Sequence, residues 1–208
     1  MLSSSTKNSL NFKPVLGVGD SMPKNLNNVR EDILLVTRQL LKDTGYSSLS
    51  IRQIAAKCGV ASGTVYNYYS SKNEIIAEIL NNEWNLMLRR IDQSTKSSIK
   101  AIDKLEIMFN ELSYFMNNVH GFWIDSYPIE KDTNINLCTI REKKQFLRNQ
   151  LSDKIYSFAD VKQTGNDEAR NICQTVAVIL IAYSNDNIDY SILKPSLSAL
   201  VKEIEKQK

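Results

Sequence analysis

Apolar residues recur at helical spacing through most of the chain, and no stretch shows the two-residue alternation of a half-buried strand. The pattern starts at Val29 and is interrupted by short segments rich in Gly, Asn, Ser or Asp. The helices predicted from it span 29–44, 51–58, 61–68, a segment from about 72 to at least 91, 99–118, 135–160, 167–184, and a last segment around 193–204. The sequence therefore predicts an all-α fold.

The most informative segment runs from Ser50 to Tyr69 and reads SIRQIAAKCGVASGTVYNYY. Ser50 is a good N-cap for the first of two short helices. Gly59 permits the positive φ that a tight turn between them often needs. This arrangement predicts a helix-turn-helix. A helical hairpin that serves only packing is the alternative, but its solvent face would favour Glu and Lys.

The exposed side of the second short helix instead carries small polar residues and an aromatic one. Such groups suit the base edges and phosphates of a DNA major groove. They are Ser62, Gly63, Thr64, Asn67 and Tyr68.

Charge points weakly in the same direction. Residues 1–80 hold nine basic and six acidic residues, a difference equal to the net charge of +3 of the whole chain. A positive excess at one end of a chain fits an anionic partner at that end.

These residues resemble the N-terminal domain of TetR-type (tetracycline-repressor-like) transcriptional regulators. The resemblance covers about 50 residues without gaps, from Ile33 to Leu80, and beyond them it extends only to length and helical pattern. The matching segments are Gly45-Tyr46, Leu49-Ser50, the turn from Ile54 to Val60, the recognition helix from Gly63 to Tyr69, and the start of the next helix from Ser71 to Ile76.

The resemblance implies a set of contacts to double-stranded DNA. Ser50 and Arg52 would touch phosphate or a groove edge, and Lys72 would clamp a phosphate at a helix N-terminus. Tyr69 would pack in the domain core. Bases would face Ser62, Gly63, Thr64 and Asn67, and phosphates would face Tyr66 and Tyr68.

The chain departs from the family pattern at Ala61, where a Ser or Thr cap is common, and at Ser62, where a longer polar or basic side chain is common. The recognition helix has no Arg or Lys on its exposed face, so the bidentate contact to guanine is missing. We therefore expect affinity to depend on phosphate contacts, with help from the basic arm around Lys24 and Arg30.

A palindromic operator has two half-sites one helical turn apart, about 34 Å, so reading both requires a dimer. The helix predicted over 167–184 is apolar nearly all round, which favours burial on two sides. The resemblance implies a homodimer interface of four helices, and burial within one chain is the alternative. The predicted interface residues are Ile172, Val176, Ile179, Tyr183, Leu197, Leu200, Val201 and Ile204.

The segment between these regions is rich in aromatic residues and Met, which suits a pocket between helices. The resemblance implies an effector pocket there, while ordinary core is the alternative for any single residue. The effector would be small and apolar or aromatic, or a cation held by aromatic faces, and its binding would release the DNA. The predicted pocket residues are Trp84, Met108, Leu112, Phe115, Phe122, Trp123 and Tyr127.

Other classes of protein are disfavoured. A single histidine, His120, and no phosphate-binding glycine loop argue against an enzyme, and we expect no cofactor and no metal. Three scattered cysteines indicate a reducing cytoplasm, and Cys58 is either an oxidant sensor or a small core residue. No apolar run reaches membrane-spanning length and no signal peptide is evident. A helical module that docks protein rather than DNA remains the rival.

The predicted organisation has three parts: a flexible arm over 1–26, a three-helix helix-turn-helix domain over 27–75, and a helical effector-binding and dimerisation domain over 76–208. Met22 could begin a shorter protein, so the sequence leaves open whether residues 1–21 belong to the native chain. Effector identity, the operator, and repression as against activation are likewise left open.

Overall fold

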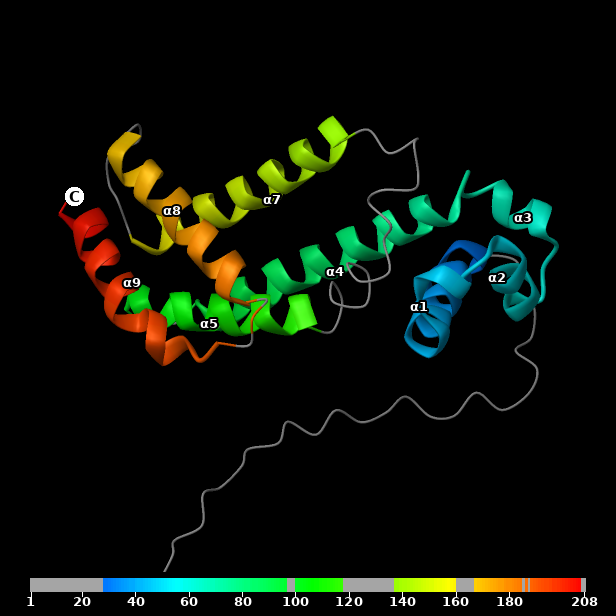
Figure 1. Cartoon of the computed structure of the whole chain (residues 1–208), viewed down its shortest axis with the longest axis horizontal. Helices are drawn as coiled ribbons and strands as arrows, with labels where there is room; N and C mark the ends of the chain where they lie inside the picture. The colour runs from blue at the N-terminus through cyan, green and yellow to red at the C-terminus, as the bar shows by residue number, and fades with distance from the viewer. Residues whose placement is uncertain are drawn as a thin grey trace, which may run out of the picture.

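The computed structural model describes residues 28–96, 100–117, 137–159, 167–184, 186 and 188–206. All regular structure within these ranges is helical, which confirms the predicted all-α class (Figure 1). None of the described helices combines the length and apolar character needed to cross a membrane. The helices are α1 (Val29–Ser48), α2 (Ile51–Cys58), α3 (Ser62–Tyr66), α4 (Lys72–Ser94), α5 (Ala101–Phe115), α7 (Leu137–Phe158), α8 (Asp167–Ser184) and α9 (Tyr190–Glu205).

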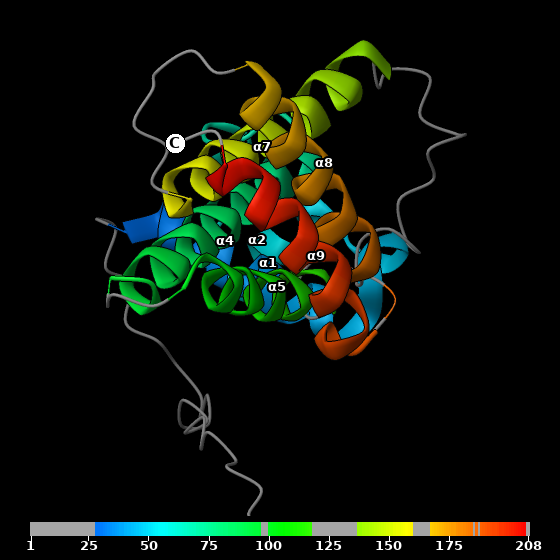
Figure 2. The same ribbon diagram turned by 90° about the vertical axis from the view of Figure 1, so that its left-hand side faces the viewer.

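The long helix α4 connects two groups of helices. Helices α1, α2 and α3 gather at its N-terminal end, and α5, α7, α8 and α9 gather towards the other end (Figure 1). Figure 2 looks at this second end, where α8 and α9 lie towards the viewer.

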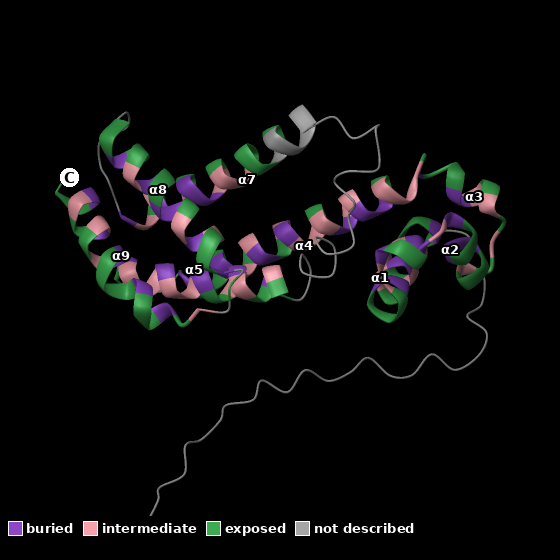
Figure 3. Cartoon of the chain, in the orientation of Figure 1, coloured by how far each residue is buried: buried purple, intermediate pink, exposed green. Residues whose placement is uncertain are grey.

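Buried apolar side chains form two clusters that match these groups. The N-terminal core takes residues from α1, α2, α3 and the first turns of α4. The C-terminal core takes residues from the rest of α4 and from α5, α7, α8 and α9. Leu80 packs against both cores. The molecule therefore has a small and a large core that share one helix, with exposed faces on the outside of each group (Figure 3).

Local signals in the sequence set the helix ends in the N-terminal core. Gly45 adopts φ 74° and ψ 173°, which breaks the regular helix where the sequence predicts a stop, although α1 resumes as far as Ser48. Gly59 adopts φ 67°, and the Val60 and Gly59 N–H groups donate to the Ala55 and Ala56 carbonyls at 3.0 and 3.2 Å. These two bonds are a Schellman ending, in which a left-handed residue satisfies carbonyls at the end of a helix.

Hydroxyl side chains cap the other ends. The Ser50 hydroxyl accepts the Gln53 N–H, as its position predicts, and the Ser71 hydroxyl caps α4 by accepting the Glu74 N–H. The recognition helix is shorter than predicted. It begins at Ser62 without a side-chain cap and ends at Tyr66, and a turn over Asn67 and Tyr68 follows.

Candidate nucleic-acid interface

Helices α2 and α3 form a helix-turn-helix whose inner side is apolar. Ile51, Ile54 and Ala55 of α2 and Val65 of α3 are buried in the N-terminal core. Burial of these small and branched side chains keeps the two helices close and leaves their other sides in solvent. The predicted motif is therefore present, with one face available to a partner.

The predicted base-facing residues lie on or directly after α3. Gly63 and Asn67 are exposed, while Ser62 and Thr64 are half-buried. A Cβ added at Gly63 would meet no atom within 4 Å, so the space beside it is open. The bases on the floor of a DNA groove can therefore come close to these residues. The contacts of these residues to bases remain predictions.

Three tyrosines follow the same segment and divide into two kinds. Tyr66 and Tyr68 are 56% and 44% exposed, which is unusual for large aromatic side chains and suits the phosphate contacts predicted for them. Tyr69 is buried in the N-terminal core, as predicted. Its hydroxyl accepts the Arg30 Nε–H at 3.3 Å, and burial raises the pKa of Tyr69 above 10.0.

Two predicted phosphate contacts sit on α2. The Ser50 hydroxyl also donates to Gln53 Oε1 at 2.9 Å, so it already serves as a cap. Arg52, in the first turn, is exposed on the solvent side. A cation at that place can reach a phosphate, whereas Ser50 acts first on the helix itself.

Lys72 is positioned differently from the prediction of an open phosphate clamp. Its Nζ donates to the carbonyls of Tyr46 and Leu49 at 3.2 and 3.0 Å, and it lies 4.1 Å from the centroid of the Tyr46 ring. The Tyr46 hydroxyl donates to Asn73 Oδ1 at 2.8 Å. The ammonium thus has partners within the protein.

Ion pairs tie α1 to α4 beside this face. Arg30 pairs with Glu78 at 2.8 Å and Arg38 with Glu83 at 3.1 Å. A phosphate contact of Arg30, which the sequence predicts, would therefore share the guanidinium with Glu78. Neither pair could be predicted from the sequence, because partners 45 or more positions apart leave no periodic signal.

Cys58 lies at the end of α2, half-buried. Burial, and secondarily the negative charge of Asp32, raises the pKa of its thiol to about 11. Because the thiolate is the reactive form, this environment favours the core role over the oxidant sensor. The described residues also contain no cluster of three His, Cys, Asp or Glu side chains that could hold a metal ion, and His120 lies outside them.

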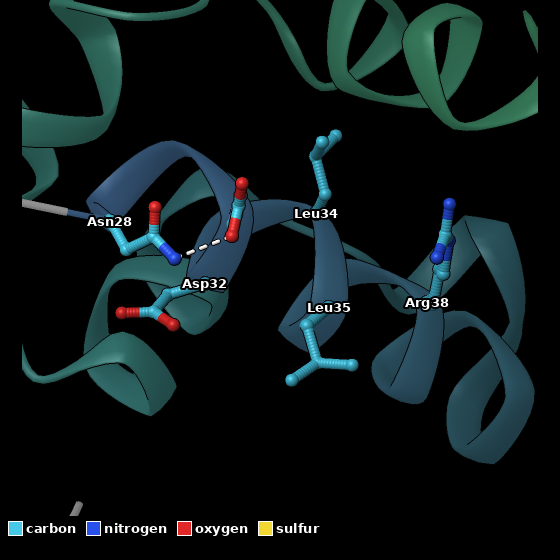
Figure 4. Close-up of a pocket in the computed structure, with 6 residues that line it drawn as sticks. Asn28, Asp32, Leu34, Leu35 and Arg38 are labelled. Atoms are coloured by element: carbon cyan, nitrogen blue, oxygen red, sulfur yellow. Dashed lines mark hydrogen bonds between the residues drawn. The ribbon is translucent and has the colours of Figure 1, made fainter. Parts of the chain in front are cut away.

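A shallow hollow runs along α1 (Figure 4). All its lining residues come from this helix and the residue before it, and Leu35 within it is 59% exposed. Asn28 donates a hydrogen bond to Glu31 at one end. A hollow lined by a single helix lacks the enclosing walls of a small-molecule site.

Four of the predicted effector-pocket residues come together in the C-terminal core. Trp84, Met108, Leu112 and Phe115 are all buried there, and the Trp84 and Phe115 rings meet edge to face with centroids 5.5 Å apart. Phe122, Trp123 and Tyr127 lie outside the described residues.

Trp84 Nε1 donates to Gln150 Oε1 of α7 at 2.8 Å. Gln150 is not predicted as a functional residue from the sequence, because it lies beside the apolar stripe of α7 among other polar residues.

The predicted interface residues of α8 and α9 divide by burial. Val176, Leu197, Val201 and Ile204 lie in the core of their own chain, so they are not available to a second copy. The helical period identified the apolar stripe correctly, but α5, α7 and the neighbouring terminal helix cover it. Ile172, Ile179 and Leu200 are half-buried, and Tyr183 is 39% exposed. Two exposed apolar residues were missed, Val178 at 44% and Ile192 at 67%.

Comparison with known proteins places similarity mainly in the helix-turn-helix. Residues 33–79 match the family described as "Bacterial regulatory proteins, tetR family". The Fatty acid metabolism regulator protein of Bacillus subtilis is 22% identical over 99 residues, which are 48% of this chain and 51% of that protein. The HTH-type transcriptional repressor KstR2 of Mycolicibacterium smegmatis is 25% identical over 80 residues, 38% of this chain and 39% of that protein. The chain therefore spans about half the length, or less, of these curated relatives.

The fold extends further than the sequence similarity. The crystal structure of the transcriptional regulator FadR from Bacillus subtilis in complex with stearoyl-CoA superposes with a TM-score of 0.52 at 17% identity. The superposition covers 86% of this chain and 98% of that one. The helical domain that follows the helix-turn-helix thus shares its architecture with known regulators.

Proposed function

Through residues 33–79 the chain belongs to the tetR family of bacterial regulatory proteins, and we propose on that premise that it is a homodimeric, sequence-specific transcriptional repressor. It acts on DNA in the cytoplasm and catalyses no reaction. The observation that carries the proposal is the exposed polar side of α3, backed by a fully apolar inner side. The related KstR2 protein, described as a repressor, supports repression over activation.

The bases are read by Thr64 and Asn67, with Ser62 and Gly63 allowing close approach. Ser50, Arg52, Tyr66 and Tyr68 contact the sugar-phosphate backbone. Backbone contacts of this kind fix the register of the protein, and base contacts supply the sequence preference.

A binding assay with the protein's own upstream DNA tests this assignment. In fluorescence anisotropy with excess nonspecific DNA, Thr64→Ala and Asn67→Ala should each weaken specific binding by about 1–3 kcal/mol. Asn110→Ala, an exposed polar position on α5, is the matched control and should bind like wild type. Equal losses on specific and random DNA for the α3 variants would contradict a role in base recognition.

The homodimer forms through the exposed parts of α8 and α9. Val178, Tyr183 and Ile192 are exposed apolar side chains on these two helices. Together with the half-buried Ile172, Ile179 and Leu200 they offer an apolar surface that a second copy can cover. Two copies then present two recognition helices at the spacing of a palindromic operator, about 34 Å.

Light scattering at micromolar concentration tests the dimer. Ile192→Glu should give a monomer with weakened operator binding, because a buried unpaired carboxylate is costly. Phe146→Glu on α7 is the matched control, since Phe146 is 60% exposed but lies on another helix. A wild-type protein that stays monomeric would refute the dimer.

The effector is a small molecule with a large apolar or aromatic part, bound next to Trp84, Met108, Leu112 and Phe115. Phe122, Trp123 and Tyr127 complete the proposed pocket. Three partly exposed acidic side chains near the C-terminal core form ion pairs: Glu111 with Arg90 at 2.7 Å, Glu106 with Lys194 at 3.1 Å, and Asp92 with Lys154. A cationic effector would therefore be held by aromatic faces rather than by these carboxylates.

Long-chain acyl-CoA thioesters are the first probes to use, because the superposed FadR structure contains stearoyl-CoA. A thermal-shift titration should show stabilisation, and the same compound should release the DNA. Trp84→Ala should abolish the shift, whereas Phe146→Ala should leave it intact. If none of the acyl-CoA, fatty acid or aromatic compounds stabilises the protein, the result argues against the pocket.

A further inference from the structure

The corner between α1 and α2 carries two carbonyl groups that accept hydrogen bonds from the first residue of α4. The last carbonyls of a helix have no partner within it. Here Gly45 interrupts the regular backbone, so Tyr46 and Leu49 lie in the irregular end of α1 and the link to α2. Both side chains are buried in the N-terminal core. The Leu49 N–H donates to the Tyr46 carbonyl at 3.1 Å. The Lys72 ammonium adds a second hydrogen bond to that carbonyl at 3.2 Å and donates to the Leu49 carbonyl at 3.0 Å.

The same ammonium lies over the face of the Tyr46 ring, 4.1 Å from its centroid, which is a favourable cation–π distance. The next residue of α4 holds the other end of this ring, because the Tyr46 hydroxyl donates to Asn73 Oδ1 at 2.8 Å. Two consecutive residues in the first turn of α4 therefore hold one buried tyrosine and the backbone around it. α2 begins two residues after Leu49, so this corner fixes where the helix-turn-helix starts.

We propose that Lys72 is a positioning residue of the DNA-binding domain: it fastens the α1–α2 corner to the start of α4 and thereby sets the orientation of the recognition helix. A Lys ammonium has three N–H donors. Two of them serve the carbonyls of Tyr46 and Leu49, and the positive charge lies at the negative end of α1. Lys72 then contributes to DNA affinity without neutralising a phosphate.

The proposal differs from a phosphate clamp in its dependence on salt, and it rests on the proposed DNA binding. Each phosphate neutralised on duplex DNA contributes about −0.9 to the slope of log K against log salt concentration. A positioning residue lowers affinity by a constant factor at every salt concentration. The two roles therefore predict different slopes for the same variant.

The experiment compares Lys72→Met with Arg52→Met, which removes an exposed cation from the same domain. Affinity for the upstream DNA is measured by anisotropy at several salt concentrations. Lys72→Met should bind about tenfold more weakly or worse throughout, with the wild-type slope. Arg52→Met should flatten the slope by about 0.9. Lys72→Arg should recover part of the lost affinity, because a guanidinium can still donate to both carbonyls.

Hydrogen exchange on the free protein gives a second measurement that needs no DNA. Lys72→Met should raise amide exchange around Leu49 and through α2, and Arg52→Met should not. If wild type binds no DNA, the proposed function fails, and the exchange result alone decides the role of Lys72. If Lys72→Met does not fold, Lys72→Gln takes its place in both measurements. A flattened slope with unchanged exchange would overturn the proposal in favour of a phosphate contact.

Discussion

The N-terminal and C-terminal cores share α4, yet they are assembled by different means. The N-terminal core includes the two short helices α2 and α3, and it uses helix ends that are fixed by Ser50, Gly59 and Ser71. The C-terminal core uses longer helices that pack along apolar stripes and are joined across their edges by polar pairs such as Trp84–Gln150. Signals close in sequence specify the first, whereas packing between distant helices specifies the second. Mutations should therefore affect the two cores separately and by different mechanisms.

The largest effects should come from truncating one buried side chain in each core. Ile54 and Leu180 are both fully buried, one in each core. Ile54→Ala and Leu180→Ala should each lower the free energy of unfolding by about 2–5 kcal/mol. Ile54→Ala should abolish DNA binding and advance the loss of helical circular dichroism, while the fluorescence of Trp84, measured with Trp123→Phe in both proteins, keeps its midpoint.

Leu180→Ala should instead shift the fluorescence midpoint. If both variants shift both signals equally, the chain unfolds as one cooperative unit and the comparison of two cores fails.

Backbone conformation gives the next largest effect, and two glycines of the helix-turn-helix should respond in opposite directions. Neither has an atom within 4 Å of an added Cβ, so crowding plays no part. Gly59→Ala should destabilise the protein by about 1–2 kcal/mol, because its φ of 67° is left-handed. Gly63→Ala should stabilise α3 by about 0.5–1 kcal/mol.

Thermal unfolding measures both effects, and an operator-binding assay adds a second test. Gly63→Ala should weaken DNA binding despite the gain in stability. Unchanged binding would show that Gly63 does not lie against the DNA.

Removal of a buried hydroxyl should stabilise the protein, by less than truncation in either core destabilises it. Thr37 of α1 is fully buried, and its Oγ1 has no hydrogen-bond partner within the described structure. Thr37→Val keeps the shape and removes the unpaired hydroxyl, so it should stabilise the protein by about 1 kcal/mol in chemical denaturation. Thr44→Val is the matched control and should give no gain, since the exposed Thr44 donates to the Leu40 carbonyl at 2.9 Å. A loss of stability in Thr37→Val would point to a polar partner at this position.

The smallest effect concerns the start of α4 and depends on pH. The Ser70 N–H and hydroxyl donate to the Glu74 carboxylate at 2.7 and 2.9 Å and lower its pKa below 4.5. When folding lowers the pKa of a carboxyl group, its charged form stabilises the protein at pH values above the pKa of the unfolded state. This stabilisation is lost as the pH falls through the pKa of the folded state. Glu74→Gln should therefore have a lower Tm than wild type at pH 7 and the same Tm in strong acid. Glu142→Gln, at an exposed position on α7, should match wild type at both pH values.

The sequence was sufficient for the N-terminal core because its signals are local. The cap at Ser50 and the left-handed turn at Gly59 follow from residue types at fixed short spacing, and the burial of Tyr69 follows from the family resemblance of the same segment. Helix ends were less predictable: α3 spans Ser62–Tyr66, whereas the sequence predicts a helix over 61–68. The helical period identified the apolar stripes of α8 and α9, but it did not identify the helices that pack against them. An amphipathic period shows that a face is buried without showing which helix buries it.

The sequence by itself determined the all-α fold, the helix-turn-helix, and the exposed polar side of its second helix. Only the tertiary structure decided that Lys72 faces two carbonyls, that Val176, Leu197, Val201 and Ile204 belong to the chain's own core, and that Gln150 reaches Trp84. The physical reason is the range of the interactions. Propensity, capping and periodicity act over a few residues, whereas these contacts join positions that are far apart in the chain and meet only when the helices pack.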